Sequence, residues 1–227
     1  MELIEALKSS RKMELRTPSE PMVRRVPKSW WGLKRTMDVV FGALFLALAA
    51  PVIAAAALAI MIVSPGSPFF VQRRVGRLGR PFALWKLRTM VCGAHLLHDG
   101  LQHLNEVDGP VFKIRKDPRL HSLGAFLRKS SIDELPNFWN VLTGDMSIVG
   151  PRPPLPSEVE HYSEYAMRRL TVKPGITCLW QTSGRSNLSF DEWMRLDNEY
   201  IDTWTPLCDL KIMLRTIPTV LRREGAH

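Results

Sequence analysis

Two adjacent carboxylates, Asp133 and Glu134, have the clearest capacity for chemistry in this sequence. They lie in the segment SSIDELPNFWNVL. Proline is best tolerated in the first turn of a helix, so Pro136 predicts a helix from about Ile132 to Leu142 with both acids at its N-terminus. The N–H groups there favour negative charge, including that of a phosphoryl group. The pair therefore suits phosphoryl chemistry.

Helix capping is the alternative for the same residues. Ser131 and Glu134 match the S-x-x-E capping box, in which the two side chains bond to the N–H groups of the first turn. Taken alone, the pattern favours capping over catalysis.

Basic residues elsewhere in the sequence shift this balance toward catalysis. Several fixed cations around a carboxylate pair suit phosphoryl transfer, where positioning and charge stabilisation dominate the barrier. Each cation alone is also typical of a solvated surface. The candidates for binding phosphate or nucleotide are Lys86, Arg88, Arg128, Arg152 and Arg185.

One uncharged run, from Val39 to Val63, is long enough for a transmembrane helix. Pro51 follows Ala50 at its midpoint and predicts a kink. Basic residues flank both sides, so the positive-inside rule assigns both flanks to the cytoplasm. We therefore predict a re-entrant membrane helix over residues 30–64, bent at Ala50 and Pro51; a kinked single span is the alternative. The flanking residues are Lys28, Lys34, Arg35, Arg73, Arg74, Arg77 and Arg80.

The rest of the chain predicts a mainly α fold with a small β element. We expect residues 1–29 to form a basic arm and residues 65–227 to form a cytoplasmic α/β domain that carries the two acids. Its last helix is basic and amphipathic, which suits either a membrane surface or an ordinary core helix. The expected elements are a strand over residues 83–90 and helices over residues 120–129, 132–142, 158–170, 190–204 and 208–222.

The composition points to an anionic partner. The 227 residues include 31 Lys and Arg against 22 Asp and Glu, a net charge of +9, which fits a phosphorylated substrate or an anionic lipid. Much of this charge brackets the membrane segment, so we expect no nucleic-acid binding. The three cysteines and the histidines at 95, 98 and 103 form no recognisable metal pattern.

Several long motifs resemble the bacterial sugar transferase family, the monotopic polyprenyl-phosphate hexose-1-phosphate transferases. They are FFVQRRVGRLGRPFALWKLRTM, KIRKDPRLHSLGAFLRKSSIDELPNFWNVLTGDMSIVGPRP, VKPGITCLWQTSGRS and DLKIMLRTIPTVLRREGAH. The resemblance covers roughly residues 30–227. Ala50 stands where family members commonly have serine before the bend, and Cys178 stands where glycine is usual.

The resemblance implies an enzyme of the inner membrane with its catalytic domain on the cytoplasmic face. It would transfer a sugar 1-phosphate from a UDP-sugar to polyprenyl phosphate and release UMP. Asp133 would be the nucleophile and form an aspartyl phosphosugar. Glu134 would assist the lipid phosphate or, with Asp133, help to hold Mg²⁺. A homodimer and a non-catalytic membrane adaptor that binds acidic partners stay open.

Overall fold

The structure, a computed structural model, describes residues 26–97, 99–112, 114, 116–183 and 188–222. The basic arm, apart from its last four residues, therefore lies outside the described residues. So do His98 and the candidate Arg185. As predicted, the fold is mostly helical with two small sheets.

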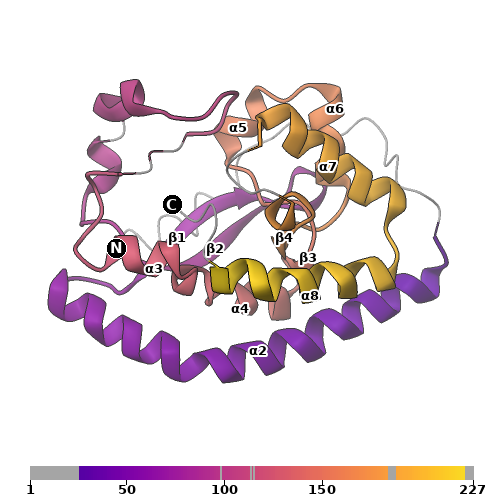
Figure 1. The fold of residues 1–227 in the computed structure, drawn as a ribbon, viewed down its shortest axis with the longest axis horizontal. Helices are drawn as coiled ribbons and strands as arrows, with labels where there is room; N and C mark the ends of the chain where they lie inside the picture. Colours follow the sequence, from indigo (N-terminus) through magenta and orange to yellow (C-terminus); the bar gives the residue numbers. More distant parts are fainter. Residues whose placement is uncertain (1–25, 98, 113, 115, 184–187, 223–227) are drawn as a thin grey trace.

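The longest element is helix α2, Lys28–Val63. It runs as one arc along an edge of the molecule (Figure 1) and spans about 54 Å at 1.5 Å per residue. Pro51 lies inside it, and the helix continues through this residue. Among the described residues, α2 is the one helix that is long and apolar enough to cross a membrane.

The N-terminal part of α2 is bound to the body of the protein by buried polar side chains. Lys34 Nζ donates to Asp209 Oδ2 at 2.6 Å and to the carbonyl of Val149 at 3.0 Å. Asp38 Oδ1 accepts from Ser147 Oγ at 2.8 Å and from the N–H of Ile148 at 2.9 Å. Lys34 is therefore more than a flanking charge, because it joins the helix to the rest of the protein.

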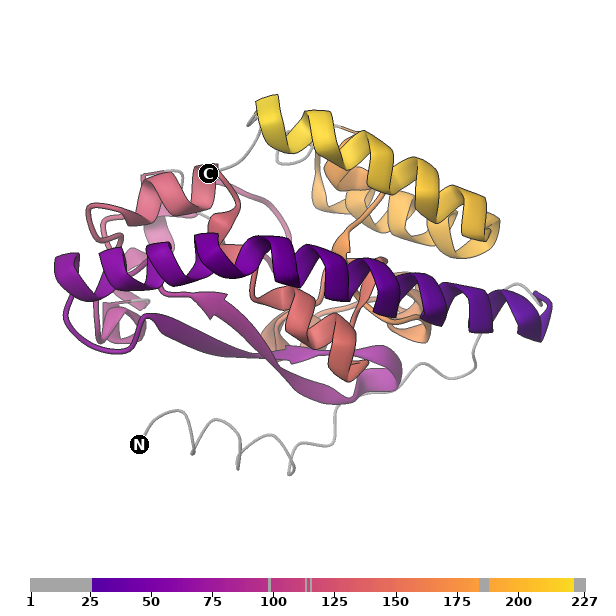
Figure 2. The ribbon, with the colours of Figure 1, turned by 90° about the horizontal axis from the view of Figure 1, so that it is seen from below.

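The C-terminal end of α2 is bound to the same body. Ile60 is fully buried and packs in a cluster with Leu87 and Leu127. The guanidinium of Arg88 donates to the carbonyls of Ser64 and Pro65, which directly follow the helix. Both ends of α2 therefore contact one folded unit, as the view in Figure 2 also indicates.

The main sheet is an antiparallel hairpin of β1, Phe69–Val75, and β2, Pro81–Leu87. Phe69 lies opposite Leu87, and Val75 lies opposite Pro81. The strand predicted over residues 83–90 overlaps β2, which begins two residues earlier and ends at Leu87, whereas its partner β1 was not predicted. A second sheet pairs β3, Ser147–Val149, in parallel with β4, Gly175–Thr177.

The two C-terminal helices were predicted well from the sequence. They are α7, Phe190–Thr203, and α8, Pro206–Arg222. Ser189 and Glu192 form a complete capping box at the start of α7, which fixes where that helix begins.

The other three predicted helices are shorter or broken. The helix over 120–129 begins only at Gly124, since α3 is Gly124–Lys129. The predicted helix over 132–142 is wrong, because it is divided into a 3-10 turn η4, Ile132–Glu134, and α4, Asn137–Thr143. The helix over 158–170 is also wrong, because three pieces replace it: α5, Pro156–Glu160; α6, Glu164–Met167; and η5, Arg168–Thr171.

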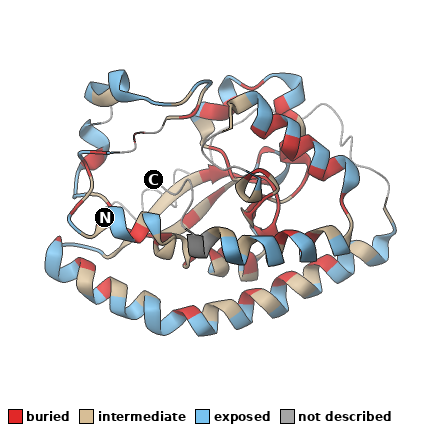
Figure 3. Ribbon diagram, in the orientation of Figure 1, coloured by how far each residue is buried: buried red, intermediate tan, exposed pale blue. Residues whose placement is uncertain are grey.

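Short 3-10 turns complete the regular structure. They are η1, Arg77–Gly79; η2, Ala94–Leu97; η3, Asp99–Leu104; and η6, Trp180–Thr182. Three apolar clusters form the core, and buried residues gather between the hairpin, α7 and α8 (Figure 3). The cluster containing Phe82, Val149 and Ile201 joins the hairpin to β3, α7 and α8. It therefore holds these four parts of the fold together.

Candidate active site

The backbone at Asp133 and Glu134 is a tight 3-10 turn that precedes α4. Ser131 starts this turn in the left-handed conformation, with φ of 56°, and its side chain makes no capping hydrogen bond. The predicted capping box is therefore not formed. The two acids also do not lie in the first turn of α4, because Leu135 and Pro136 separate them from it.

Asn140 fixes α4 against strand β2. Its Nδ2 donates to the carbonyl of Ala83 at 2.7 Å, and its Oδ1 accepts from the N–H of Trp85 at 3.1 Å. Both partners are backbone groups of β2, so the side chain of Asn140 substitutes for a neighbouring strand. This contact holds the turn that carries the acids beside Lys86, which follows Trp85.

Glu134, in the turn that Asn140 holds against β2, forms an ion pair with Lys86 of β2. Lys86 Nζ lies 2.7 Å from Glu134 Oε1. Removal from water raises the pKa of Glu134, but the charge and hydrogen bond of Lys86, with the charges of Arg152 and Arg74, outweigh this effect and lower its pKa. Glu134 is therefore ionised at neutral pH, and its side chain remains partly exposed.

Asp133 is more deeply buried, with 7% of its surface exposed. The pKa of Asp133 is raised to about 6 in total: burial is the largest cause and the charge of Glu134 adds to it, while the cations Lys86 and Arg128 oppose it. Above this pKa the carboxylate is charged, poorly hydrated and close to cations, which is the condition of an activated nucleophile.

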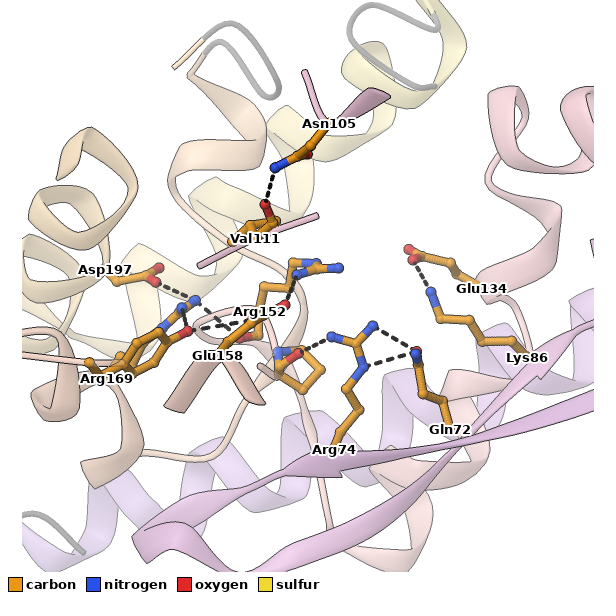
Figure 4. A network of polar contacts seen from close by, with 12 residues as sticks. Gln72, Arg74, Lys86, Asn105, Val111, Glu134, Arg152, Glu158, Arg169 and Asp197 are labelled. Carbon is orange, nitrogen blue, oxygen red and sulfur yellow. Dashed lines mark hydrogen bonds and ion pairs between the residues drawn. The ribbon is translucent and has the colours of Figure 1, made fainter. Parts of the chain in front are cut away.

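A small pocket opens between the hairpin, the acidic turn and the segment after β3. Cations enter it from two elements: Arg74 and Lys86 come from the hairpin, and Arg152 comes from the loop after β3. Figure 4 shows the Lys86–Glu134 pair facing Arg74 and Arg152. The remaining lining residues are Leu84, Asn137, Met146, Pro153, Gly175, Ile176 and Gln181.

Arg74 is held rigidly in this pocket. Its guanidinium donates to Gln72 Oε1 at 2.7 and 3.1 Å and to the carbonyl of Pro153 at 2.9 Å. Burial lowers its pKa to about 9, and the nearby charge of Arg152 contributes to this shift. Two arginines held this close favour an anionic ligand that would relieve their repulsion.

Arg152 is positioned from behind by a buried network. Its guanidinium lies 3.8 Å from Glu158 Oε1, and its carbonyl accepts a hydrogen bond from Arg169 Nη2 at 3.1 Å. Arg169 is paired in turn with the buried carboxylate of Asp197 at 2.8 Å. The network leaves Arg152 pointing toward the pocket (Figure 4).

The other predicted cations lie in different surroundings. Arg128 donates to Thr89 Oγ1 at 3.1 Å; burial lowers its pKa, and the charge of Asp133 is the largest influence that raises it. Arg128 is therefore near the acid. Arg88 instead binds the chain that follows α2 and also donates to Cys92 Sγ at 2.6 Å, so its role in this structure is to anchor the helix.

Arg74 and Asn137 are pocket residues that the sequence reasoning missed. Phe70 lies opposite Lys86 in the hairpin, and side chains on one face of a strand recur at every second residue. Arg74 therefore shares a face with Lys86. Recognising β1 as a strand would have revealed this, whereas Arg74 was read only as a membrane-flanking charge.

The acids could hold a divalent cation. Among the described residues, no group of three or more His, Cys, Asp and Glu side chains forms a metal cluster, and His95 and His103 are exposed. Mg²⁺ is commonly bound by one or two carboxylates while water and substrate phosphates supply the other oxygens. Asp133 and Glu134 fit that donor set.

Comparisons with known proteins give a consistent result. The family model for the bacterial sugar transferases matches residues 29–223. The galactosyl transferase CpsE of Streptococcus agalactiae is 49% identical over 71% of this chain and 36% of its own length. The UDP-glucose:undecaprenyl-phosphate glucose-1-phosphate transferase of Caulobacter vibrioides is 44% identical over 86% of this chain and 72% of its own length. The exopolysaccharide production protein ExoY of Rhizobium meliloti is 35% identical over 86% of this chain and 88% of its own length.

Proposed function

Because the chain belongs to the bacterial sugar transferase family, we propose that it transfers a sugar 1-phosphate from a UDP-sugar to polyprenyl phosphate. The products are polyprenyl-diphosphate sugar and UMP. The chain spans 36% of the length of CpsE. The observation that carries the proposal is the buried acid Asp133, whose neighbour in the sequence, Glu134, lines a pocket with Arg74, Lys86 and Arg152.

The proposed reaction has two displacements at one phosphorus atom. A carboxylate oxygen of Asp133 attacks the phosphorus that bears the sugar, and the bond from that phosphorus to the bridging oxygen breaks, so UMP leaves. An oxygen of polyprenyl phosphate then attacks the same phosphorus and displaces the carboxylate. The enzyme returns unchanged, and ping-pong kinetics follow.

The cations stabilise the charge that these steps move. Lys86, Arg74 and Arg152 provide donors for the diphosphate oxygens in the pocket that they line. Glu134, held by Lys86, would keep its charge near the incoming lipid phosphate or bind metal. We propose Asp133 and Glu134 as the residues that would hold Mg²⁺, which when bound would neutralise diphosphate charge.

We also propose that α2 is a re-entrant element in the bacterial inner membrane, with the catalytic body on the cytoplasmic face. The contacts of Lys34 and Arg88 support this topology, because they tie opposite ends of α2 to one body. A straight span would carry its two ends to opposite faces of the bilayer. Exposed apolar side chains along the helix, such as Val40, Leu48 and Ile62, are available to lipid.

The test is release of UMP from UDP-sugars offered with polyprenyl phosphate, Mg²⁺ and membranes that contain the protein. Asp133→Asn should lose at least 1,000-fold in turnover, roughly the loss seen when a reacting group is removed, while the protein stays in the membrane fraction. Lys211→Gln, on α8 outside the pocket, is the control. Strong residual turnover in Asp133→Asn would refute the nucleophile. No UMP from any UDP-sugar with the unaltered protein would favour a non-catalytic membrane adaptor.

A further inference from the structure

Asn137 is a buried polar residue that the proposed reaction leaves without a role. Only 4% of its surface is exposed, and it lines the pocket with Lys86, Glu134 and Arg152. Its Oδ1 has no hydrogen-bonding partner among the described residues. Buried polar atoms are nearly always paired in native proteins, so an unpaired one beside a pocket requires an explanation.

The neighbouring Asn140 shows what a structural asparagine looks like on the same helix. Its carboxamide is equally buried, but both of its ends bond to the backbone of β2 at Ala83 and Trp85. Asn137 lies one turn earlier, and its Oδ1 has no such contact. Replacing it should therefore leave the folded protein intact, in contrast to Asn140.

The chemistry of the unpaired oxygen limits which ligand group it can bind. Oδ1 only accepts hydrogen bonds, whereas phosphate oxygens at neutral pH also only accept. The cations Arg74, Lys86 and Arg152 already suit those phosphate oxygens. The partner of Asn137 must therefore be a donor, and the hydroxyl groups of a sugar are donors.

Within the proposed reaction, we assign Asn137 to the transferred sugar rather than to the nucleobase. It follows Glu134 by three residues and lines the same pocket. In the proposed reaction the sugar is attached to the phosphorus that Asp133 attacks, whereas the nucleobase lies beyond a second phosphate and a ribose. We propose that Asn137 Oδ1 accepts a hydrogen bond from one hydroxyl of the transferred sugar and makes Asn137 a specificity-determining residue. This inference rests on the proposed function.

The experiment compares the unaltered protein with Asn137→Ala on the UDP-sugar that it uses best and on the monodeoxy analogues of that sugar. The unaltered protein should use one analogue at least about 10-fold less efficiently in kcat/KM, because a hydroxyl bonded at a buried site is then missing. Asn137→Ala should lose a similar factor on the parent sugar. It should also use that analogue and the parent with nearly equal efficiency, since the partner of the hydroxyl is gone.

Two further measurements distinguish sugar recognition by Asn137 from a structural role and from nucleotide binding. Asn137→Ala and Asn137→Ser should keep the melting temperature of the unaltered protein or exceed it, while Asn140→Ala should lower it. Inhibition by UMP should be unchanged in both Asn137 variants, since UMP lacks the transferred sugar.

Unchanged discrimination against every analogue would overturn the proposal. Weaker inhibition by UMP with unchanged sugar discrimination would also overturn it and assign Asn137 to the nucleotide. Absence of UMP release by the unaltered protein with every UDP-sugar would instead refute the proposed function on which the inference rests.

Discussion

At the scale of single residues, the central feature is the contrast between two adjacent carboxylates. Glu134 faces Lys86 at 2.7 Å and has a lowered pKa, whereas burial raises the pKa of Asp133 to about 6. Neighbouring acids whose pKa values are pushed apart usually have different tasks. We expect Asp133 to react and Glu134 to supply a permanent negative charge.

The raised pKa predicts how the activity depends on pH. Asp133 must be ionised to attack phosphorus, so kcat/KM for UMP release should fall about 10-fold for each pH unit below about 6. Above about pH 7, where Asp133 is fully ionised, its titration should no longer change kcat/KM. The measurement is a pH–rate profile at subsaturating UDP-sugar, and a flat profile down to pH 5 would contradict the assignment.

The same burial predicts a gain in stability when the charge is removed. The folded-state pKa of Asp133 is raised above its usual 3.8, so its stabilising contribution is present at low pH and is lost as pH rises through about 6. Asp133→Asn should therefore increase the free energy of unfolding by about 1–3 kcal/mol at pH 8 and by little near pH 4. Urea denaturation at both pH values tests this, and a destabilised variant at pH 8 would contradict it.

At the scale of elements, α2 is joined to the site through β3. Asp38 is buried in α2 and accepts from Ser147 and Ile148 of β3, and β3 leads directly to Arg152. Removing the acceptor leaves two buried donors unpaired. Asp38→Ala should destabilise the protein by about 2–4 kcal/mol.

The matched control for this prediction is Thr36→Ala. Thr36 lies on the same helix but is exposed, and among the residues that the structure describes its hydroxyl bonds only to the carbonyl of Gly32 within α2. Its replacement should change stability by no more than about 0.5 kcal/mol. Equal effects of the two substitutions in thermal unfolding would show that the α2–β3 contact contributes nothing.

The elements also show what could and could not be predicted from the sequence. Long periodic segments such as α7 and α8 were predicted, because their apolar faces repeat over many residues. The helix over 120–129 was predicted too long. Gly124 lies so close to the carbonyl of Thr89 that a Cβ would be 2.1 Å from its oxygen, so tertiary contact determines where α3 begins.

The site itself was predicted only in part. Asp133, Glu134, Lys86 and Arg152 were recognised as candidates, and the structure brings the last three to one pocket. Arg88 was assigned to the same group, but its bonds to Ser64 and Pro65 depend on where α2 ends in space. Arg74 and Asn137 were missed because their roles depend on strand register and on unpaired atoms, which sequence spacing does not reveal.

At the scale of the whole molecule, α2 contacts the body of the protein near both of its ends and, through Arg35, at α4. The proposed topology places Lys28 and Arg80, which are both exposed, on the cytoplasmic face. Lys28→Cys and Arg80→Cys should be labelled only from the cytoplasmic side by an impermeant maleimide. Cys92 is exposed and should first be replaced by serine. Labelling of the two positions from opposite sides would refute the re-entrant helix.

The most direct test of the central claim is a single-turnover measurement without the lipid acceptor. If Asp133 is the nucleophile, the protein mixed with its UDP-sugar and Mg²⁺ should release UMP in an amount equal to the active protein and then stop. The quenched protein should carry the mass of the sugar phosphate on the peptide containing Asp133. Asp133→Asn should give neither signal. UMP release that begins only when polyprenyl phosphate is added, with no labelled protein, would contradict the covalent mechanism.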